Sequence, residues 1–128
     1  MKKRILIVED DRAIQESLRS LLAEEGFDSI SAFNGQEATT YLESLNKNEL
    51  PDLILLDLMM PIKDGFSFRL EQRDDPKISH IPVVIMTATS ETKEVQKLLE
   101  IETLIKKPFD METILKAVYH HCPISSVA

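Results

Sequence analysis

The stretch Leu53-Ile54-Leu55-Leu56, followed directly by Asp57, decides the predicted fold. Four successive apolar residues without polar alternation are typical of a parallel strand that helices cover on both faces. Residues 5–8 and 81–86 have the same character, and residues 29–33 and 103–106 are weaker candidates. The sequence therefore predicts five short strands buried in one sheet.

Apolar residues with helical spacing fill the segments between these runs. They stand at positions 14, 18, 21 and 22 ahead of Gly26, at 38, 41, 42 and 45, and at 95, 98 and 99. The spacing also runs from Met111 to Cys122 before Pro123, whereas a helix over residues 66–73 has a weaker pattern. Strand and helix thus alternate five times. This predicts an α/β fold, a doubly wound five-stranded parallel sheet with helices on both faces.

Length and charge limit the classes of function. The 128 residues fit one domain, which we expect over residues 1–123, with a short C-terminal tail at 124–128. A net charge of −7 weighs against non-specific binding to nucleic acid or to an anionic membrane. The single cysteine, Cys122, excludes an intrachain disulfide, and no apolar run is long enough for a signal peptide or a membrane span. We therefore expect a soluble, cytoplasmic protein.

Polar side chains follow four of the five predicted strands. In open parallel sheets, ligands bind beyond the carboxyl ends of the strands, where the winding direction reverses. We expect these side chains to converge there, except that Asp11 suits the start of the helix that follows it. The polar residues are Glu9, Asp10 and Asp11 after the first strand, Asp57 after the third, Thr87 after the fourth, and Lys106 and Lys107 at the end of the fifth.

Such a set of groups can support phosphoryl transfer. Carboxylates at close range repel each other and need a cation, and a site with only oxygen ligands favours Mg²⁺. An ammonium group and the Thr87 hydroxyl would hold phosphoryl oxygens, while Asp57 would be the in-line nucleophile that forms an acyl phosphate. An acid at position 57, between apolar neighbours, would be costly to bury without a purpose.

The positions of the three histidines in the sequence do not indicate a functional site. We expect His80, His120 and His121 to be surface or helix-end residues. Adjacent residues on a helix point in different directions, which argues against metal binding by His120, His121 and Cys122 together.

Five motifs together resemble the receiver domains of two-component response regulators. Each motif alone is weak, but together, in this order and at these separations, they are highly specific for this family. The resemblance extends from Lys3 to about His121. It implies a flavodoxin-like fold with strand order 2-1-3-4-5. The motifs are Ile5-Leu6-Ile7-Val8-Glu9-Asp10-Asp11, Asp52-Leu53-Ile54-Leu55-Leu56-Asp57-Leu58-Met59-Met60-Pro61, Asp64-Gly65, Pro82-Val83-Val84-Ile85-Met86-Thr87-Ala88, and Lys107-Pro108-Phe109.

The resemblance also implies a role for each residue of the site. Asp57 is the phosphoacceptor, and Thr87 and Lys107 bind the phosphoryl oxygens. The Lys107–Pro108 bond is expected to be cis, as in the family. The metal set comprises Asp10 as a direct Mg²⁺ ligand, Glu9 acting mainly through water, Asp57, and Met59 through its backbone carbonyl alone.

Partners follow from the same resemblance. A sensor histidine kinase or a histidine phosphotransfer protein would donate the phosphoryl group. Since no effector domain follows in the sequence, output would pass to a downstream protein or by onward phosphotransfer. We expect a monomer or a phosphorylation-dependent dimer, and no enzyme activity beyond the chain's own phosphorylation and dephosphorylation.

Two departures from the family pattern support an alternative. Leu104 stands three positions before Lys107, where many receivers carry an aromatic residue whose rotation reports phosphorylation. The segment from Thr87 to Lys107 is shorter than usual, so we expect a short fourth helix. Both features suit a degenerate receiver that acts as a constitutive protein-interaction module.

An aspartyl-phosphate phosphatase is less favoured, because Met59 replaces the general acid such an enzyme needs. A flavodoxin-like cofactor binder is weaker still, because a carboxylate-lined crevice repels a flavin phosphate.

Overall fold

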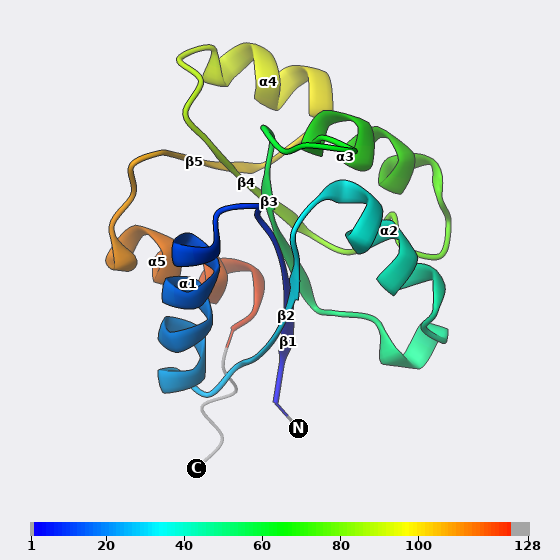
Figure 1. The fold of residues 1–128 in the computed structure, drawn as a ribbon, viewed down its shortest axis with the longest axis horizontal. Coiled ribbons are helices and arrows are strands. Elements are labelled where there is room, and N and C mark those ends of the chain that lie inside the picture. Colours follow the sequence, from blue (N-terminus) through cyan, green and yellow to red (C-terminus); the bar gives the residue numbers. More distant parts are fainter. Residues whose placement is uncertain (1, 124–128) are drawn as a thin grey trace.

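The computed structural model describes residues 2–123 and has a central parallel sheet between two layers of helices (Figure 1). Its five strands lie in the order β2-β1-β3-β4-β5, which confirms the predicted fold and strand order. The tail predicted at residues 124–128 lies outside the described residues. The strands are β1 (Arg4–Val8), β2 (Asp28–Ala32), β3 (Leu53–Asp57), β4 (Val83–Thr87) and β5 (Thr103–Lys106). The helices are α1 (Arg12–Glu24), α2 (Gly35–Glu43), the 3₁₀ helix η1 (Lys47–Glu49), α3 (Gly65–Asp74), α4 (Thr92–Leu99) and α5 (Met111–His121).

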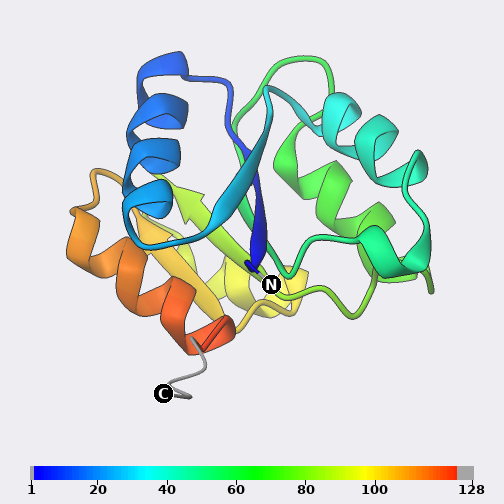
Figure 2. The same cartoon turned by 90° about the horizontal axis from the view of Figure 1, so that it is seen from below.

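Alternate residues of each central strand pack on opposite helix layers. In β1, Ile5 and Ile7 pack in the cluster that contains residues of α1 and α5, whereas Leu6 and Val8 pack in the cluster that contains residues of α2, α3 and α4. Figure 2 shows α1 and α5 on one face of the sheet and α2 and α3 on the other. Burial on both faces explains why these strands are apolar throughout.

Four helices begin at a side chain that accepts a hydrogen bond from the backbone. This satisfies one of the amides that a helix start leaves without a partner. Asp11 accepts from the Ile14 amide at 3.0 Å, which confirms its predicted capping role. Asn34, Asp64 and Asp110 do the same for α2, α3 and α5.

The element ends differ from the sequence prediction where apolar residues continue past them. The fourth strand was expected from residue 81, but β4 begins at Val83, because Pro82 has no amide hydrogen to donate to the ladder. Cys122 was expected within the last helix and instead follows its end. Leu45 likewise lies beyond α2 while packing on the core. The fourth helix is short, as expected, with 8 residues.

The chain changes winding direction between β1 and β3, which lie side by side at the centre of the sheet. The register pairs Val8 with Leu56, so the next residues, Glu9 and Asp57, emerge together at the carboxyl ends of the two strands. Within residues 2–123, no helix combines the length and the apolar character that crossing a membrane requires.

Candidate functional site

Three carboxylates meet beyond the ends of β1 and β3. One oxygen from each of Glu9, Asp10 and Asp57 can be chosen so that all three lie within 4.8 Å of one another. Glu9 and Asp57 are 0% and 4% exposed, whereas Asp10 lies at the surface. Glu9 and Asp57 are therefore shielded from solvent, whereas Asp10 is accessible to it.

Lys107 reaches this cluster from the end of β5. Its Nζ lies 2.6 Å from Glu9 Oε1 and 3.5 Å from Asp57 Oδ1. Its backbone amide donates a 2.7 Å hydrogen bond to the Thr87 carbonyl, and the Lys107–Pro108 bond is cis, as the family resemblance implied. Lys106 is exposed, so of the two neighbouring lysines the structure brings only Lys107 to the acids.

The close packing changes the proton affinities of these groups. Burial, together with the neighbouring Asp57, raises the pKa of Glu9 to about 8. Burial alone would lower the pKa of Lys107, but its contacts with Glu9 and Asp57 outweigh this and raise it. One lysine ammonium does not offset two buried carboxylate charges, so Glu9 keeps its proton to a higher pH than an exposed glutamate does.

One oxygen of the cluster fits a bound cation. Glu9 Oε2 is buried and has no hydrogen-bond partner in the structure, which describes residues 2–123. A buried acceptor without a donor is costly unless a cation or water meets it. Because the ligands at hand are all carboxylate oxygens, a hard ion such as Mg²⁺ suits the set.

Thr87 and Met59 lie next to Asp57 in different ways. Thr87 is buried at the end of β4, one residue beyond Met86, which pairs with Asp57. Its Oγ1 accepts a hydrogen bond from the Thr89 amide at 3.2 Å, so the hydroxyl can still donate. The Met59 amide donates to Asp57 Oδ1 at 3.4 Å, while Met59 as a whole is 71% exposed. The metal contact assigned to the Met59 carbonyl stays a prediction.

Sequence reasoning missed two residues that shape this site. Gly65 was named only within the Asp64-Gly65 motif and given no role, yet a Cβ there would lie 2.2 Å from the Asp57 carbonyl oxygen. Gln15 is buried, and its Nε2 donates to the carbonyls of Ile7, Glu9 and Ala32 at 2.8, 3.2 and 2.9 Å. It therefore ties the ends of β1 and β2 together beneath the acids. A polar residue beside the apolar stripe of the first helix was the only sequence signal for Gln15.

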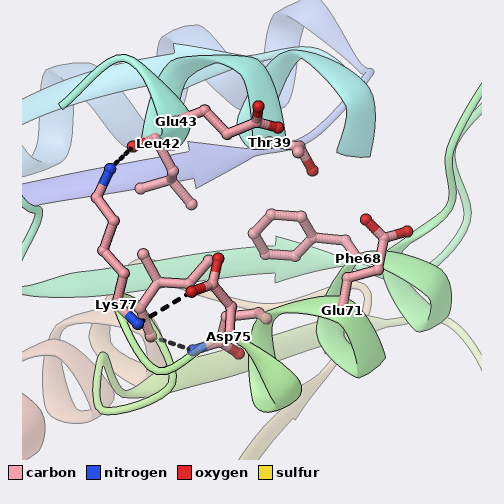
Figure 3. Close-up of a pocket in the computed structure, with 9 residues that line it drawn as sticks. Thr39, Leu42, Glu43, Phe68, Glu71, Asp75 and Lys77 are labelled. Carbon is pink, nitrogen blue, oxygen red and sulfur yellow. Dashed lines mark hydrogen bonds between the residues drawn. The ribbon is translucent and has the colours of Figure 1, made fainter.

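A separate hollow of about 380 Å³ lies between α2 and α3 (Figure 3). The Lys77 ammonium crosses to the Leu42 carbonyl at 3.0 Å, and the Lys77 amide donates to Asp75 at 2.9 Å. These polar groups are used in structural hydrogen bonds, so the hollow lacks the converging reactive groups of the strand-end cluster.

Comparison with known proteins identifies relatives along nearly the whole chain. The family model described as response regulator receiver domain matches residues 5–119. Sporulation initiation phosphotransferase F of Bacillus subtilis (strain 168) is 36% identical over 130 residues, covering 98% of this chain and 98% of that protein. The probable transcriptional regulator ycf27 of Porphyridium aerugineum is 36% identical over 122 residues, or 91% of this chain and 48% of that protein.

The chain spans about half the length of several curated relatives that it matches, including ycf27. Among solved structures, the signal receiver domain of a signal transduction histidine kinase from Syntrophus aciditrophicus has a TM-score of 0.83 and 30% identity. That match covers 98% of this chain and 94% of the other.

Proposed function

Because this chain belongs to the family of response regulator receiver domains, we propose that it accepts a phosphoryl group on Asp57. The donor would be the phosphohistidine of a sensor histidine kinase or of a histidine phosphotransfer protein. The observation that supports this most directly is the convergence of Asp57, Glu9 and Lys107 from three separate strand ends. Phosphoryl transfer needs little more from a protein than position and opposing charge.

Mg²⁺ would be held by the carboxylates of Glu9, Asp10 and Asp57 and by the Met59 carbonyl. The buried oxygen of Glu9 that lacks a hydrogen-bond partner supports this assignment. When bound, the ion supplies positive charge that offsets the repulsion between the carboxylates and an incoming phosphoryl group.

Asp57, Lys107 and Thr87 would each have a separate role in the transfer. An Asp57 carboxylate oxygen forms a bond to phosphorus in line with the phosphorus–nitrogen bond of the donor. That bond breaks, and its electron pair stays on the donor imidazole nitrogen. Lys107, already 3.5 Å from Asp57, neutralises one phosphoryl oxygen, and the Thr87 hydroxyl donates to another. The chain promotes its own phosphorylation and dephosphorylation and turns over no other substrate.

The phosphorylated chain would act in the cytoplasm by changing which protein it binds, as a monomer or as a phosphorylation-dependent dimer. Similarity to sporulation initiation phosphotransferase F over 98% of both chains favours onward phosphotransfer as one output. A degenerate, never-phosphorylated module is not favoured, because Asp57, Thr87 and Lys107 are all present, and Lys107 reaches Asp57.

The test is labelling by acetyl phosphate, followed by intact-mass measurement. With Mg²⁺ the wild-type chain should gain one phosphoryl group, and Asp57→Asn should gain none while remaining folded. Asp11→Asn is a matched control, since Asp11 caps α1 and asparagine caps equally well. Equal labelling of the Asp57→Asn variant would assign the phosphoryl group elsewhere. Absence of both labelling and Mg²⁺-dependent beryllofluoride binding in the wild type would support the degenerate module.

A further inference from the structure

Two histidines and a glutamate meet at the end of the molecule opposite the carboxylate cluster. His120 and His121 are the last residues of α5, and Glu102 directly precedes β5. The carboxylate cluster lies beyond the carboxyl ends of parallel strands, whereas Glu102 lies before the amino end of one. Figure 2 shows the end of α5, drawn in red, beside the segment that joins α4 to β5.

The side chains are already in contact. His120 Nε2 lies 2.8 Å from Glu102 Oε1, and the two imidazole rings meet edge to face with centroids 4.8 Å apart. His121 Nε2 lies 2.9 Å from the Thr103 hydroxyl. One ligand atom from each of Glu102, His120 and His121 can be chosen so that all three lie within 4.8 Å of one another. The side chains of adjacent helix residues normally point in different directions. Here Glu102, which precedes β5, supplies a third ligand atom near both histidines.

The chemistry of this group differs from that of the carboxylate cluster. Imidazole nitrogens suit borderline ions such as Zn²⁺, and two histidines with one carboxylate form a common ligand set. Metal–ligand bonds of about 2.1 Å require ligand atoms closer together than 4.8 Å. The side chains of His120 and Glu102 are 61% and 69% exposed, so they can rotate inward at little cost. The net charge of −7 also favours the approach of a cation.

The third histidine of the chain borders the same region. A cavity of about 180 Å³ is lined by His80, Glu100, Glu102 and His121, among others. All three histidines of the sequence therefore lie on or beside one surface hollow. Cys122 points elsewhere, since it is buried with its Sγ 3.8 Å from the Asp52 carbonyl.

We propose that Glu102, His120 and His121 bind a divalent transition-metal ion of the Zn²⁺ type, with water or His80 as a further ligand. The ion would link the end of α5 to the start of β5. The chain would then hold two cation sites of different preference, one for Mg²⁺ at the carboxylate cluster and one for Zn²⁺ at this group.

The test is Zn²⁺ binding to the untagged full chain by calorimetry, with millimolar Mg²⁺ present to occupy the carboxylate cluster. We expect one ion per chain and at least tenfold weaker binding in His120→Ala and in Glu102→Gln. Because His120 is exposed, its removal should leave the fold intact, which thermal unfolding without Zn²⁺ checks. Cys122→Ser and Asp57→Asn should bind Zn²⁺ as the wild type does.

Substitution by Co²⁺ gives a second readout. The wild type should show the visible absorption of a low-coordination Co²⁺ site, and His120→Ala should lose most of that intensity. Weaker binding in His80→Ala would identify His80 as the further ligand, whereas unchanged binding would leave that position to water. Absence of Zn²⁺ binding by the wild type, or equal affinity in the double variant His120→Ala/His121→Ala, would overturn the proposal.

Discussion

Lys107 donates a 2.6 Å hydrogen bond to Glu9, although 98 positions separate the two residues in the chain. Glu9 is fully buried, and Asp57 lies farther from the ammonium, at 3.5 Å. The lysine ammonium therefore lies closest to a carboxyl group that water does not reach. Ionising Glu9, which is buried and lies beside Asp57, therefore has a measurable cost in stability.

We expect this cost of ionising Glu9 to destabilise the metal-free fold as pH rises from 4.5 to about 8. Burial and the nearby Asp57 raise the pKa of Glu9 from 4.5 to about 8 in the folded protein. Over this range the folded state keeps a proton that the unfolded state releases, so the free energy of unfolding falls with pH. The loss should be absent below pH 4.5 and complete above about 8. Urea unfolding in EDTA at a series of pH values measures it.

Glu9→Gln isolates this effect from other titrating groups. The variant should gain stability relative to wild type as pH rises, while binding Mg²⁺ more weakly. Glu16→Gln, on the exposed side of α1, is the control and should follow the wild type at every pH. Saturating Mg²⁺ should offset the loss equally in the wild type and in Glu16→Gln, whereas Glu9→Gln has no such loss to offset. A difference between Glu9→Gln and wild type that does not change with pH would contradict the expectation.

Gly65→Ala should destabilise the fold by about 2 kcal/mol, because the added methyl overpacks against backbone that cannot move aside. The Cβ would lie 2.2 Å from the Asp57 carbonyl oxygen and 2.7 Å from the Leu58 Cα. Displacement of this strand end should also slow labelling of Asp57 by acetyl phosphate. Chemical denaturation and labelling rates measure the two effects.

Gly26→Ala is the matched control for this substitution. Gly26 has φ +87° but no atom within 4 Å of an added Cβ. It should cost about 1 kcal/mol through backbone strain and leave the labelling rate unchanged. Equal effects of the two substitutions on labelling would show that contact with the Asp57 backbone is not the cause.

The strands and the meeting of polar side chains at their ends could be predicted because each rests on a short stretch of sequence. Uninterrupted apolar runs indicated the strands, and polar residues after four of them indicated the cluster. The packing of Leu6 and Ile7 on opposite faces shows why those runs lack polar alternation. The boundaries were less predictable, since Leu45 continues the apolar pattern past the end of α2.

The features that escaped prediction depend on contacts between distant segments. The preference of Lys107 for Glu9, the contact of Gly65 with Asp57 and the burial of Gln15 appear only when strand ends are brought together. The group formed by Glu102, His120 and His121 was also missed. Adjacent histidines on one helix argued against a shared metal, and only the fold brings Glu102 to them.

Ile62→Gly should stabilise the fold by about 1 kcal/mol. Ile62 has φ 70°, a backbone region that is strained for a β-branched residue and free of strain for glycine. Relief of strain should exceed the extra backbone entropy of glycine, about 0.5–1 kcal/mol. Ile62 is 84% exposed, so little apolar burial is lost. The denaturation midpoint should rise for Ile62→Gly and change less for Ile62→Ala, because alanine keeps a Cβ. Equal midpoints for the wild type and both variants would show that the backbone at Ile62 is unstrained.

Two arginines of α3, one helical turn apart, contact the end of α4. Buried Arg69 donates to the Leu99 carbonyl at 2.9 Å, the Glu100 carbonyl at 3.0 Å and Gln72 Oε1 at 2.5 Å. Arg69→Met would leave these acceptors without donors, which should cost about 3 kcal/mol.

Arg73 is the control for Arg69, since it lies nearer the surface. It donates to the Leu98 carbonyl at 3.1 Å and forms an ion pair with Glu100 at 2.8 Å. Arg73→Met should cost less than about 1 kcal/mol, because exposed ion pairs contribute little. Hydrogen exchange should become faster in α4 in the Arg69 variant and change little in the Arg73 variant. If both variants exchanged alike, α4 would be held by its apolar contacts, such as those of Val95 and Leu99, and not by the buried guanidinium.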